Sequence, residues 1–311
     1  MTALVTGGAG FIGSHLTEAL CARGIAVTVL DNLLLGAESN LAHIQGDLTI
    51  LKGDICDREM LRKAVQGKNW VFHFAAYPSV PYSIEHPELT NEINLDATLA
   101  LLAECAAARV RRVVFSSSSS VYGDRAEVAR ESDPVHPLSP YALQKLASEQ
   151  YVRLFSELRG LPGTALRYFN VFGPRQSFSS PYSGVIARFC TTLLEGKRPI
   201  IFGAGDQSRD FVSVHDVVQA NLLAAEQDAA VGRVFNIGTG ISTSVLELLN
   251  TLKRVLGSDV EPEFQPRRTG EIQFSCADIS AAEQHLGFKP KVSLEEGLRE
   301  TLDFYRNGRT Q

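Results

Sequence analysis

The stretch that decides the fold lies at the start of the chain and reads Ala3-Leu4-Val5-Thr6-Gly7-Gly8-Ala9-Gly10-Phe11-Ile12-Gly13. Residues 3–6 predict a short buried strand, and apolar residues recur at helical spacing over residues 10–23. Gly7 allows a tight turn between them, Gly10 lets the backbone approach a pyrophosphate, and Gly13 permits close helix–strand packing. Free N–H groups at a helix N-terminus attract anions, so the stretch is typical of a dinucleotide-binding loop.

The next strand, residues 26–30, ends on Asp31, 18 residues after Gly13. A carboxylate there accepts both ribose hydroxyls of NAD and repels the 2′-phosphate of NADP, and no arginine follows it to change that preference. The sequence therefore favours NAD, the competing interpretation being an aspartate that caps a turn. Asp54-Ile55, after the third strand, is placed to contact the adenine.

Strand and helix patterns continue to alternate along the first half of the chain. We predict further strands at 48–52, 70–74, 112–117 and 164–168, and helices at 58–65, 88–108 and 140–158. The pattern predicts an α/β fold, a Rossmann-type doubly wound parallel sheet. After residue 172 a polar loop (173–184) opens a less regular region with helices at 185–195, from 214, at 245–256 and at 294–306, and a strand at 233–237. We therefore expect an NAD-binding domain over 1–172, with residues of about 205–240 interleaved into it, and a smaller α/β substrate lobe over 173–311.

A phenol and an ammonium group lie four residues apart in Tyr141-Ala142-Leu143-Gln144-Lys145. Residues at this spacing share one face of a helix. A nearby cation favours the phenolate, so we expect Lys145 to lower the pKa of Tyr141 and make it a general base. The serine run at 116–120 closes the strand before this helix, where a hydroxyl can hydrogen-bond a substrate oxygen.

Taken in order, these motifs resemble those of the extended short-chain dehydrogenases/reductases, and among them the nucleotide-sugar 4-epimerases. The matches cover nearly the whole chain, namely the loop at 6–13, His73-Phe74-Ala75-Ala76, the trio Ser118, Tyr141 and Lys145, Arg167-Tyr168-Phe169-Asn170-Val171-Phe172-Gly173, residues 203–212 and Arg268-Thr269-Gly270-Glu271. The resemblance implies that Tyr141 takes the proton from the sugar 4-hydroxyl while Lys145 holds the nicotinamide ribose. Hydride passes from C4 to NAD and returns to the opposite face of a transient 4-keto sugar.

The resemblance also implies which residues contact each ligand. Ser118 hydrogen-bonds O4, although Ser119 and Ser120 reach the same strand end, and Asn170, Arg209 and Arg268 grip the nucleotide diphosphate, which suits the paired donors of arginine. Expected cofactor contacts are Gly7, Gly10, Phe11, Ile12, Gly13, Asp31, Asn32, Asp54, Ile55, Ala75, Tyr141 and Lys145. Expected substrate contacts are Ser79, Ser118, Ser119, Tyr141, Asn170, Val185, Arg209, Arg268 and Ser275.

Two features narrow the reaction and the sugar. The related 4,6-dehydratases and decarboxylases carry acidic residues directly after the catalytic serine or threonine, where this chain has Ser119 and Ser120. Typical UDP-galactose epimerases have a tyrosine seven residues after the arginine that matches Arg268, and here that residue is Ser275. A smaller side chain leaves room for an acetamido group, so we expect UDP-GlcNAc/UDP-GalNAc and/or UDP-Glc/UDP-Gal. Ser275 facing a larger neighbouring side chain is the competing interpretation.

Composition limits the remaining possibilities. The net charge of −5 and the lack of a basic run argue against nucleic acid as a partner. Five scattered cysteines without metal spacing are typical of reduced thiols in a cytoplasmic protein, and neither a metal site nor a membrane-spanning segment is expected. By resemblance we expect a homodimer formed through the two long helices at 88–108 and 140–158. The alternative functions are another NAD-dependent nucleotide-sugar enzyme (a uronate epimerase, a dehydratase or a reductase) and, more remotely, a non-catalytic dinucleotide sensor.

Overall fold

A parallel sheet forms the centre of the molecule in the computed structural model, which describes residues 1–177, 184–267 and 272–308. Its order is β11-β6-β5-β4-β1-β2-β3, and every neighbouring pair is parallel. The strands are β1 (Thr2–Thr6), β2 (Ala26–Asp31), β3 (Leu48–Lys52), β4 (Trp70–His73), β5 (Arg112–Ser118), β6 (Gly163–Tyr168) and β11 (Val234–Ile237). The predicted Rossmann-type sheet is confirmed, with strand ends shifted by at most one residue.

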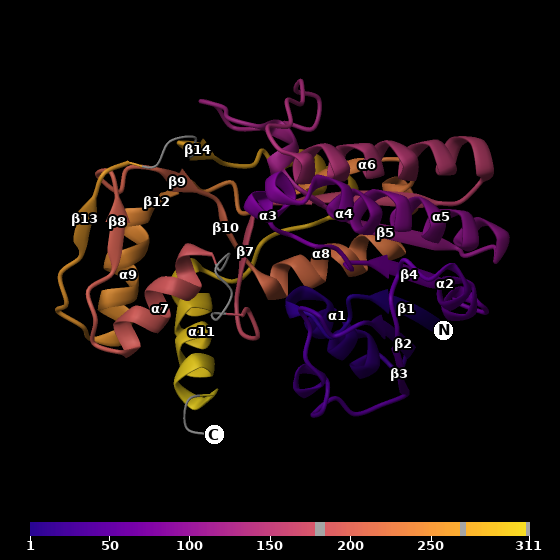
Figure 1. Ribbon diagram of the computed structural model, residues 1–311, viewed down its shortest axis with the longest axis horizontal. Helices are drawn as coiled ribbons and strands as arrows, with labels where there is room; N and C mark the ends of the chain where they lie inside the picture. The colour runs from indigo at the N-terminus through magenta and orange to yellow at the C-terminus, as the bar shows by residue number, and fades with distance from the viewer. Residues whose placement is uncertain (178–183, 268–271, 309–311) are drawn as a thin grey trace.

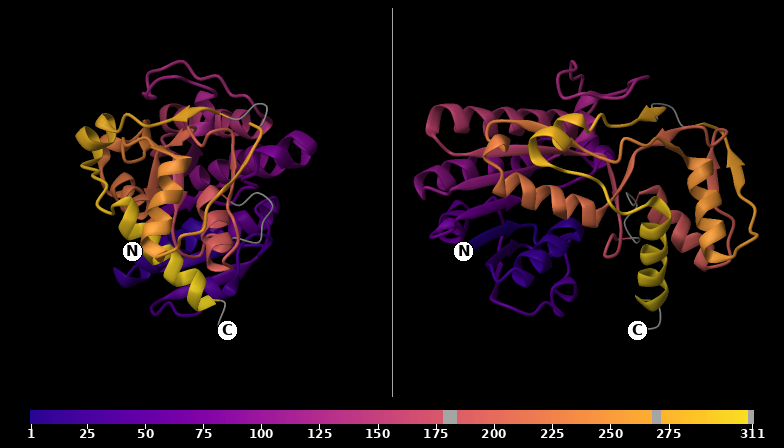
Figure 2. Two further views of the ribbon diagram at one scale, coloured as in Figure 1. Left: turned by 90° about the vertical axis from the view of Figure 1, so that its left-hand side faces the viewer. Right: turned by 180° about the vertical axis from the view of Figure 1, so that it is seen from behind.

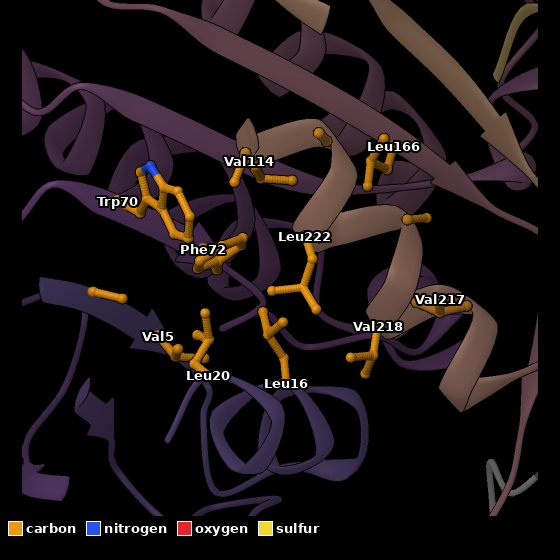
Figure 3. Packing of buried hydrophobic residues seen from close by; sticks show 14 of the residues in the cluster. Val5, Leu16, Leu20, Trp70, Phe72, Val114, Leu166, Val217, Val218 and Leu222 are labelled. Atoms are coloured by element: carbon orange, nitrogen blue, oxygen red, sulfur yellow. The ribbon is translucent and has the colours of Figure 1, made fainter. Parts of the chain in front are cut away.

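Helices cover both faces of this sheet because side chains alternate along each strand. Val5, Phe72 and Val114 face one side, where they pack against Leu16 of α1 and Leu222 of α8 (Figure 3). Their neighbours Leu4, Val71 and Val113 face the other side and pack beneath α2, α5 and α6. These helices are α1 (Phe11–Ala22), α2 (Arg58–Val65), α5 (Ala97–Ala107), α6 (Pro140–Arg159) and α8 (Val214–Glu226).

The long helix predicted at 88–108 has a break in its regular winding. The chain forms α4 (Pro87–Asn91), a π-helical turn η2 (Glu92–Asp96) and then α5. A π turn changes the direction of the carbonyls, and the Asn94 carbonyl accepts hydrogen bonds from Ser148 (3.2 Å) and Thr98 (2.8 Å). Hydrophobic spacing alone does not show such a turn, because the apolar face is nearly continuous through it.

The second half of the chain forms a smaller group of elements beside the sheet, shown at the left in Figure 1 and from two other sides in Figure 2. Its core joins α7 (Val185–Leu194), α9 (Val245–Leu256) and α11 (Leu294–Gly308). Short strands surround these helices: β7 (Asn170–Phe172), β8 (Ile200–Phe202), β9 (Ser208–Arg209), β10 (Phe211–Ser213), β12 (Thr243–Ser244), β13 (Glu263–Gln265) and β14 (Phe274–Ser275). The sequence pattern did not predict these strands, because two or three residues are too few to show alternation. The helix α10 (Ser280–Leu286) packs against the core of the first half.

Candidate active site

The glycine loop connects β1 to α1 in the geometry that the sequence predicts. Gly7 has φ of +69°, a left-handed conformation, and a Cβ there would lie 2.7 Å from the backbone nitrogen of Ala75. A side chain at Gly13 would collide with the carbonyl oxygen of Gly7, so this glycine packs against its own loop. Gly10 precedes α1 without a side-chain cap, and the neighbouring Phe11 and Ile12 begin the helix. The uncapped N–H groups of α1 therefore fit the pyrophosphate of a dinucleotide.

Asp31 ends β2 and has two roles in this region. Its Oδ2 accepts the Ala9 N–H (2.9 Å) and its Oδ1 accepts the Leu33 N–H (2.8 Å), so the carboxylate holds the glycine loop as well as lying where a ribose is expected. Nearby, Asn32 Nδ2 donates to Asp54 Oδ2 at 2.9 Å, and both residues are exposed. Ile55, by contrast, is buried in the core beneath α2.

Ala75 lies directly below the glycine loop, and its N–H donates to the Thr6 carbonyl at 3.1 Å. His73, two residues earlier, is 2% exposed, with Thr6 Oγ1 2.7 Å from its Nδ1 and Thr98 Oγ1 2.9 Å from its Nε2. Burial, with a smaller contribution from the Lys145 charge, lowers the pKa of His73 to about 3. This histidine therefore stays neutral and packed, and it does not serve as an acid or base near neutral pH.

Tyr141 and Lys145 lie in the first two turns of α6. Ser139 caps this helix by accepting the Ala142 N–H (3.2 Å), Pro140 has no N–H to satisfy, and the buried Ser83 hydroxyl accepts the Tyr141 N–H (3.1 Å). Lys145 is 3% exposed, and its ammonium donates to the Ser116 carbonyl at 2.7 Å. The Tyr141 backbone and the Lys145 side chain are thus each held by a bond from outside the helix.

In this arrangement of side chains, burial has a larger effect on the pKa of Tyr141 than the expected attraction of Lys145. Burial raises the pKa of Tyr141 to about 12, and a hydrogen bond from Ser118 lowers it only in part. The ammonium of Lys145 lies 5.9 Å from the centre of the Tyr141 ring and is directed to a carbonyl. Burial also lowers the pKa of Lys145 to about 8, against the opposing effect of the Glu149 charge. Desolvation, which the four-residue spacing does not show, outweighs the expected attraction.

The structure separates the three candidate serines. Ser118 ends β5, its hydroxyl acts on the Tyr141 phenol by lowering the pKa of that phenol, and it accepts the Ser120 N–H at 3.2 Å. Ser119 begins the short helix η3 (Ser119–Tyr122), and the Ser120 Oγ is buried without a partner among the described residues. Of the three serines, Ser118 is therefore the one that lowers the pKa of the Tyr141 phenol.

The residues expected to contact the sugar nucleotide come from several elements. Arg209 and Ser275 are in register on the paired strands β9 and β14, and Arg209 donates to the carbonyls of Ser208 and Ile272, both at 2.7 Å. Ser275 lines one small recess together with Ser119 and Phe169. Asn170 is exposed at the start of β7, and Val185 begins α7. Arg268 lies outside the described residues.

Ser79 has a different position from that of an open sugar contact. It is 4% exposed and caps α3 (Val80–Glu85), where its hydroxyl accepts the Tyr82 N–H at 3.2 Å. The helix α3 also carries Ser83, the residue bonded to the Tyr141 backbone. The segment therefore connects the expected sugar side to the first turn of α6.

The glycine loop follows β1, Asp31 ends β2 and Ser118 ends β5, so these residues and the start of α6 lie along the carboxyl edge of the parallel sheet. The sequence profile of the NAD dependent epimerase/dehydratase family matches residues 3–238. The chain belongs to this family.

Its relatives are similar over their full length. The UDP-glucose 4-epimerase of Mycolicibacterium smegmatis is 39% identical, with 99% of each chain covered. The structure of UDP-N-acetylglucosamine 4-epimerase from Methanobrevibacter ruminantium, in complex with UDP-N-acetylmuramic acid, superposes with a TM-score of 0.95 at 42% identity, covering 99% of this chain and 98% of that one. The UDP-glucose 4-epimerase of Thermotoga maritima with UDP-glucose gives a TM-score of 0.94 at 40% identity, covering 99% and 100%.

Several buried polar residues of this family member were missed by the sequence analysis. Asn94, on the π turn, accepts the Tyr77 N–H (2.7 Å) and donates to Gln144 Oε1 (2.9 Å), which ties the segment after β4 to α6. Glu149 lies four residues after Lys145, and this spacing was a signal that could have found it. In residues 1–177, 184–267 and 272–308 there is no group of three metal-ligating side chains, and none of the helices is long and apolar enough to cross a membrane.

Proposed function

We propose that this chain interconverts the C4 epimers of a UDP-hexose, with NAD, through a transient 4-keto sugar. The observation that carries the proposal is the placement of the first turns of α6, with Tyr141 and the buried Lys145, against the end of β5, where Lys145 binds the Ser116 carbonyl and Ser118 follows two residues later. One relative similar over its full length is named a UDP-glucose 4-epimerase, and one similar structure is that of a UDP-N-acetylglucosamine 4-epimerase. Both names support the same type of reaction.

The residues present fit a bound dinucleotide. A Cβ at Gly10 would meet only the Gly7 oxygen, at 3.1 Å, so the backbone beside the helix N-terminus is open to a pyrophosphate. Asp31 would accept the adenosine ribose hydroxyls, and Lys145 would reach the nicotinamide ribose. When bound, NAD supplies the hydride acceptor and donor for the sugar C4.

The chain's own side chains handle the proton. Ser118 would hydrogen-bond the sugar 4-oxygen and Tyr141 would take its proton, then return it to the oxygen after C4 has inverted. Lys145 contributes the positive charge that favours a negative phenolate once the sugar replaces water in the site. Arg209, Arg268 and Asn170 are proposed to hold the diphosphate, so that the sugar can turn about that anchor between the two hydride transfers.

For the sugar, we propose UDP-GlcNAc/UDP-GalNAc, with UDP-Glc/UDP-Gal also accepted. The small side chain of Ser275, in register with Arg209 on the paired strands β14 and β9, supports the choice. A larger pocket does not exclude the smaller sugar, since added space repels nothing.

A homodimer is part of the proposal. Large apolar side chains are exposed on the helices expected to pair: Leu89 on α4 is 44% exposed, and Leu143 on α6 is 57% exposed. A second copy of the same face would bury them around a two-fold axis. All five cysteines are free, which is compatible with the proposed cytoplasmic location.

The test is a rate assay of purified protein on UDP-GlcNAc and on UDP-Glc, first without added NAD, with products resolved by proton NMR at the sugar C1 and C4. Conversion of both sugars is expected. Conversion of UDP-Glc alone would refute the role of Ser275, and net production of NADH with an oxidised product would identify a dehydrogenase instead. If neither sugar is converted even with NAD added, the proposed reaction is wrong.

A further inference from the structure

A hydrogen-bond network of buried polar side chains runs beneath the helix α6 and has no part in the reaction described above. Its centre is an ion pair in which Arg167 of β6 donates to both oxygens of Glu149 of α6, from Nε at 3.0 Å and from Nη2 at 2.8 Å. The Ser117 hydroxyl donates to the same carboxylate. Each of these three residues is less than 5% exposed.

The hydrogen-bond network continues from Arg167 of β6 to Asn236 of the neighbouring strand β11 and then to two backbone carbonyls. Arg167 Nη1 donates to the Tyr122 hydroxyl (2.8 Å), which donates in turn to Asn236 Oδ1 (2.7 Å). The Asn236 side-chain amide then donates to the carbonyls of Ala129 (2.9 Å) and Asp278 (3.2 Å). Tyr122 is 3% exposed and Asn236 is fully buried.

The far end of this hydrogen-bond network is a segment that lines the small recess of Ser275 and Ser119, on the expected sugar side. We call residues 129–131 and 275–278 the sugar-side strap, because they are hydrogen-bonded to each other and include Ser275. The Ala129 N–H donates to the Cys276 carbonyl at 2.9 Å, and the Asp278 N–H donates to the Ala129 carbonyl at 2.8 Å. Asn236 holds both halves of the strap at one point.

The near end of the hydrogen-bond network adjoins the proton-transfer group, that is, Ser118, Tyr141 and Lys145. Ser117 stands between Ser116, whose carbonyl binds Lys145, and Ser118, which lowers the pKa of the Tyr141 phenol. Neighbouring residues of a strand face opposite sides, so Ser117 holds the strand end from beneath while Ser118 faces the site. Glu149 is one turn after Lys145, so the same helix face carries both residues.

Stability alone does not explain this arrangement. Removing two charges from water costs several kcal/mol, and hydrophobic pairs of similar volume often give the same or greater stability. A fully satisfied buried network does, however, hold its members in one relative position, because any displacement leaves a buried donor or acceptor unpaired.

We propose that Glu149, Arg167, Tyr122 and Asn236 are positioning residues that keep the sugar-side strap in fixed register with Ser118 and Lys145. The inference rests on the proposed epimerase function. A 4-keto sugar must turn and then meet the same cofactor on its other face, so both the recess and the proton-transfer group must stay in place between the two hydride transfers. Loosening the connection affects the second transfer, because the turned sugar then has no fixed recess to enter.

The variant Tyr122→Phe tests the proposal. It removes the hydroxyl at the middle of the hydrogen-bond network and leaves the Glu149–Arg167 ion pair intact. We expect kcat to fall about 10- to 100-fold, the loss typical of slight misplacement. We also expect a larger fraction of the enzyme to hold NADH during turnover, measured by absorbance at 340 nm, because the keto sugar is not reduced again. A kcat within twofold of wild type, or a lower kcat with an unchanged NADH fraction, overturns the proposal.

Tyr305→Phe is the matched control. Tyr305 lies on α11 and is 2% exposed, and its hydroxyl donates a hydrogen bond to the Gln176 carbonyl at 2.8 Å. The change therefore removes a buried phenol hydroxyl that lies outside the hydrogen-bond network. We expect its kcat and NADH fraction to match wild type, and a Tyr305→Phe enzyme with the same NADH signature as Tyr122→Phe would overturn the proposal. Should Tyr122→Phe not fold, Ser117→Ala removes a hydroxyl from the hydrogen-bond network at the end beside Ser118 and Lys145.

Hydrogen exchange separates this inference from the proposed reaction. If the wild-type protein converts neither sugar, the reaction is wrong, yet the connection can still be measured in Tyr122→Phe. Faster exchange in the strap at 129–131 and 275–278, relative to Tyr305→Phe, upholds the connection. Equal exchange in the two variants overturns it.

Discussion

Tyr141 and Lys145 are four residues apart on α6, yet their pKa values are set mainly by burial. The pKa of Tyr141 is raised to about 12 and that of Lys145 is lowered to about 8, because both charged forms lose contact with water. The ammonium of Lys145 donates a hydrogen bond to the Ser116 carbonyl at 2.7 Å. The protein thus holds a protonated phenol and a lysine whose pKa of about 8 lies close to neutral pH.

Tyr141→Phe removes the proposed base without changing the shape of the site. We expect kcat to fall about 100- to 10,000-fold, the usual contribution of a positioned acid–base group. NAD content, measured after denaturing the purified protein, should match wild type, since the loop at 7–13 is untouched. Unchanged turnover would show that another group takes the proton.

The pH dependence of kcat/KM should show the titration of Lys145. Below its pKa of about 8 the lysine carries its positive charge, and above that value the charge is lost. Activity is therefore expected to fall as pH rises through about 8, measured from pH 6 to 10 in buffers of constant ionic strength. A profile that stays flat across that range would contradict a role for the ammonium.

Ser275→Tyr tests the recess that Ser275 shares with Ser119. A phenol ring in that space should exclude an acetamido group while leaving room for a hydroxyl. We expect conversion of UDP-GlcNAc to fall by at least about 10-fold, the lower range for a lost pocket, and that of UDP-Glc to change little. Equal losses for both sugars would mean that Ser275 does not face the C2 substituent.

At the scale of elements, the first turn of α6 brings the helix to its place. Ser139, within the loop before the helix, and Ser83, from the separate helix α3, each satisfy one N–H of that turn. The sequence shows the Ser139-Pro140 start, because serine followed by proline is a local signal for a helix N-terminus. Ser83 is 58 residues away from Tyr141 and gives no such signal.

Ser83→Ala and Ser244→Ala compare two helix starts of different function. Ser244 forms a capping box with Glu247 at the start of α9, where it pairs with Ser208 of β9 and contacts neither Tyr141 nor Lys145. Each change should lower the free energy of unfolding by about 1 kcal/mol, measured by urea denaturation. Only Ser83→Ala should also lower kcat, because it frees the backbone of Tyr141. If both variants, or neither, lost turnover, Ser83 would have no specific role at Tyr141.

At the scale of the whole molecule, two groups of elements meet around the expected sugar site. The sheet and its helices carry the glycine loop and the Tyr141 group, and the elements after residue 172 supply Arg209 and Ser275 (Figure 1). The exposed leucines of α4 and α6 lie on the outer surface of the first group, away from the sheet that these helices cover.

Leu143→Glu tests the proposed homodimer. The side chain is 57% exposed, so the substitution should leave the fold of one chain intact. A buried charge at a two-fold interface would meet its own copy, and we expect light scattering to give the mass of one chain, against two for wild type. A wild-type protein of monomer mass would refute the dimer, and Leu158→Glu, at a site 74% exposed near the end of the same helix, would show whether the interface extends that far.

The sequence by itself determined the parallel sheet, the glycine loop, Asp31 at the end of β2 and the Tyr141–Lys145 spacing, because each depends on residues close together in the chain. Tertiary structure alone decided the raised pKa of Tyr141 and the effect of Ser118 on that phenol. It also decided the register of Arg209 with Ser275 and the buried hydrogen-bond network through Glu149. Burial and pairing between distant segments arise only when the chain packs. Local patterns state which groups are present, whereas packing decides which of them are desolvated and which of them meet.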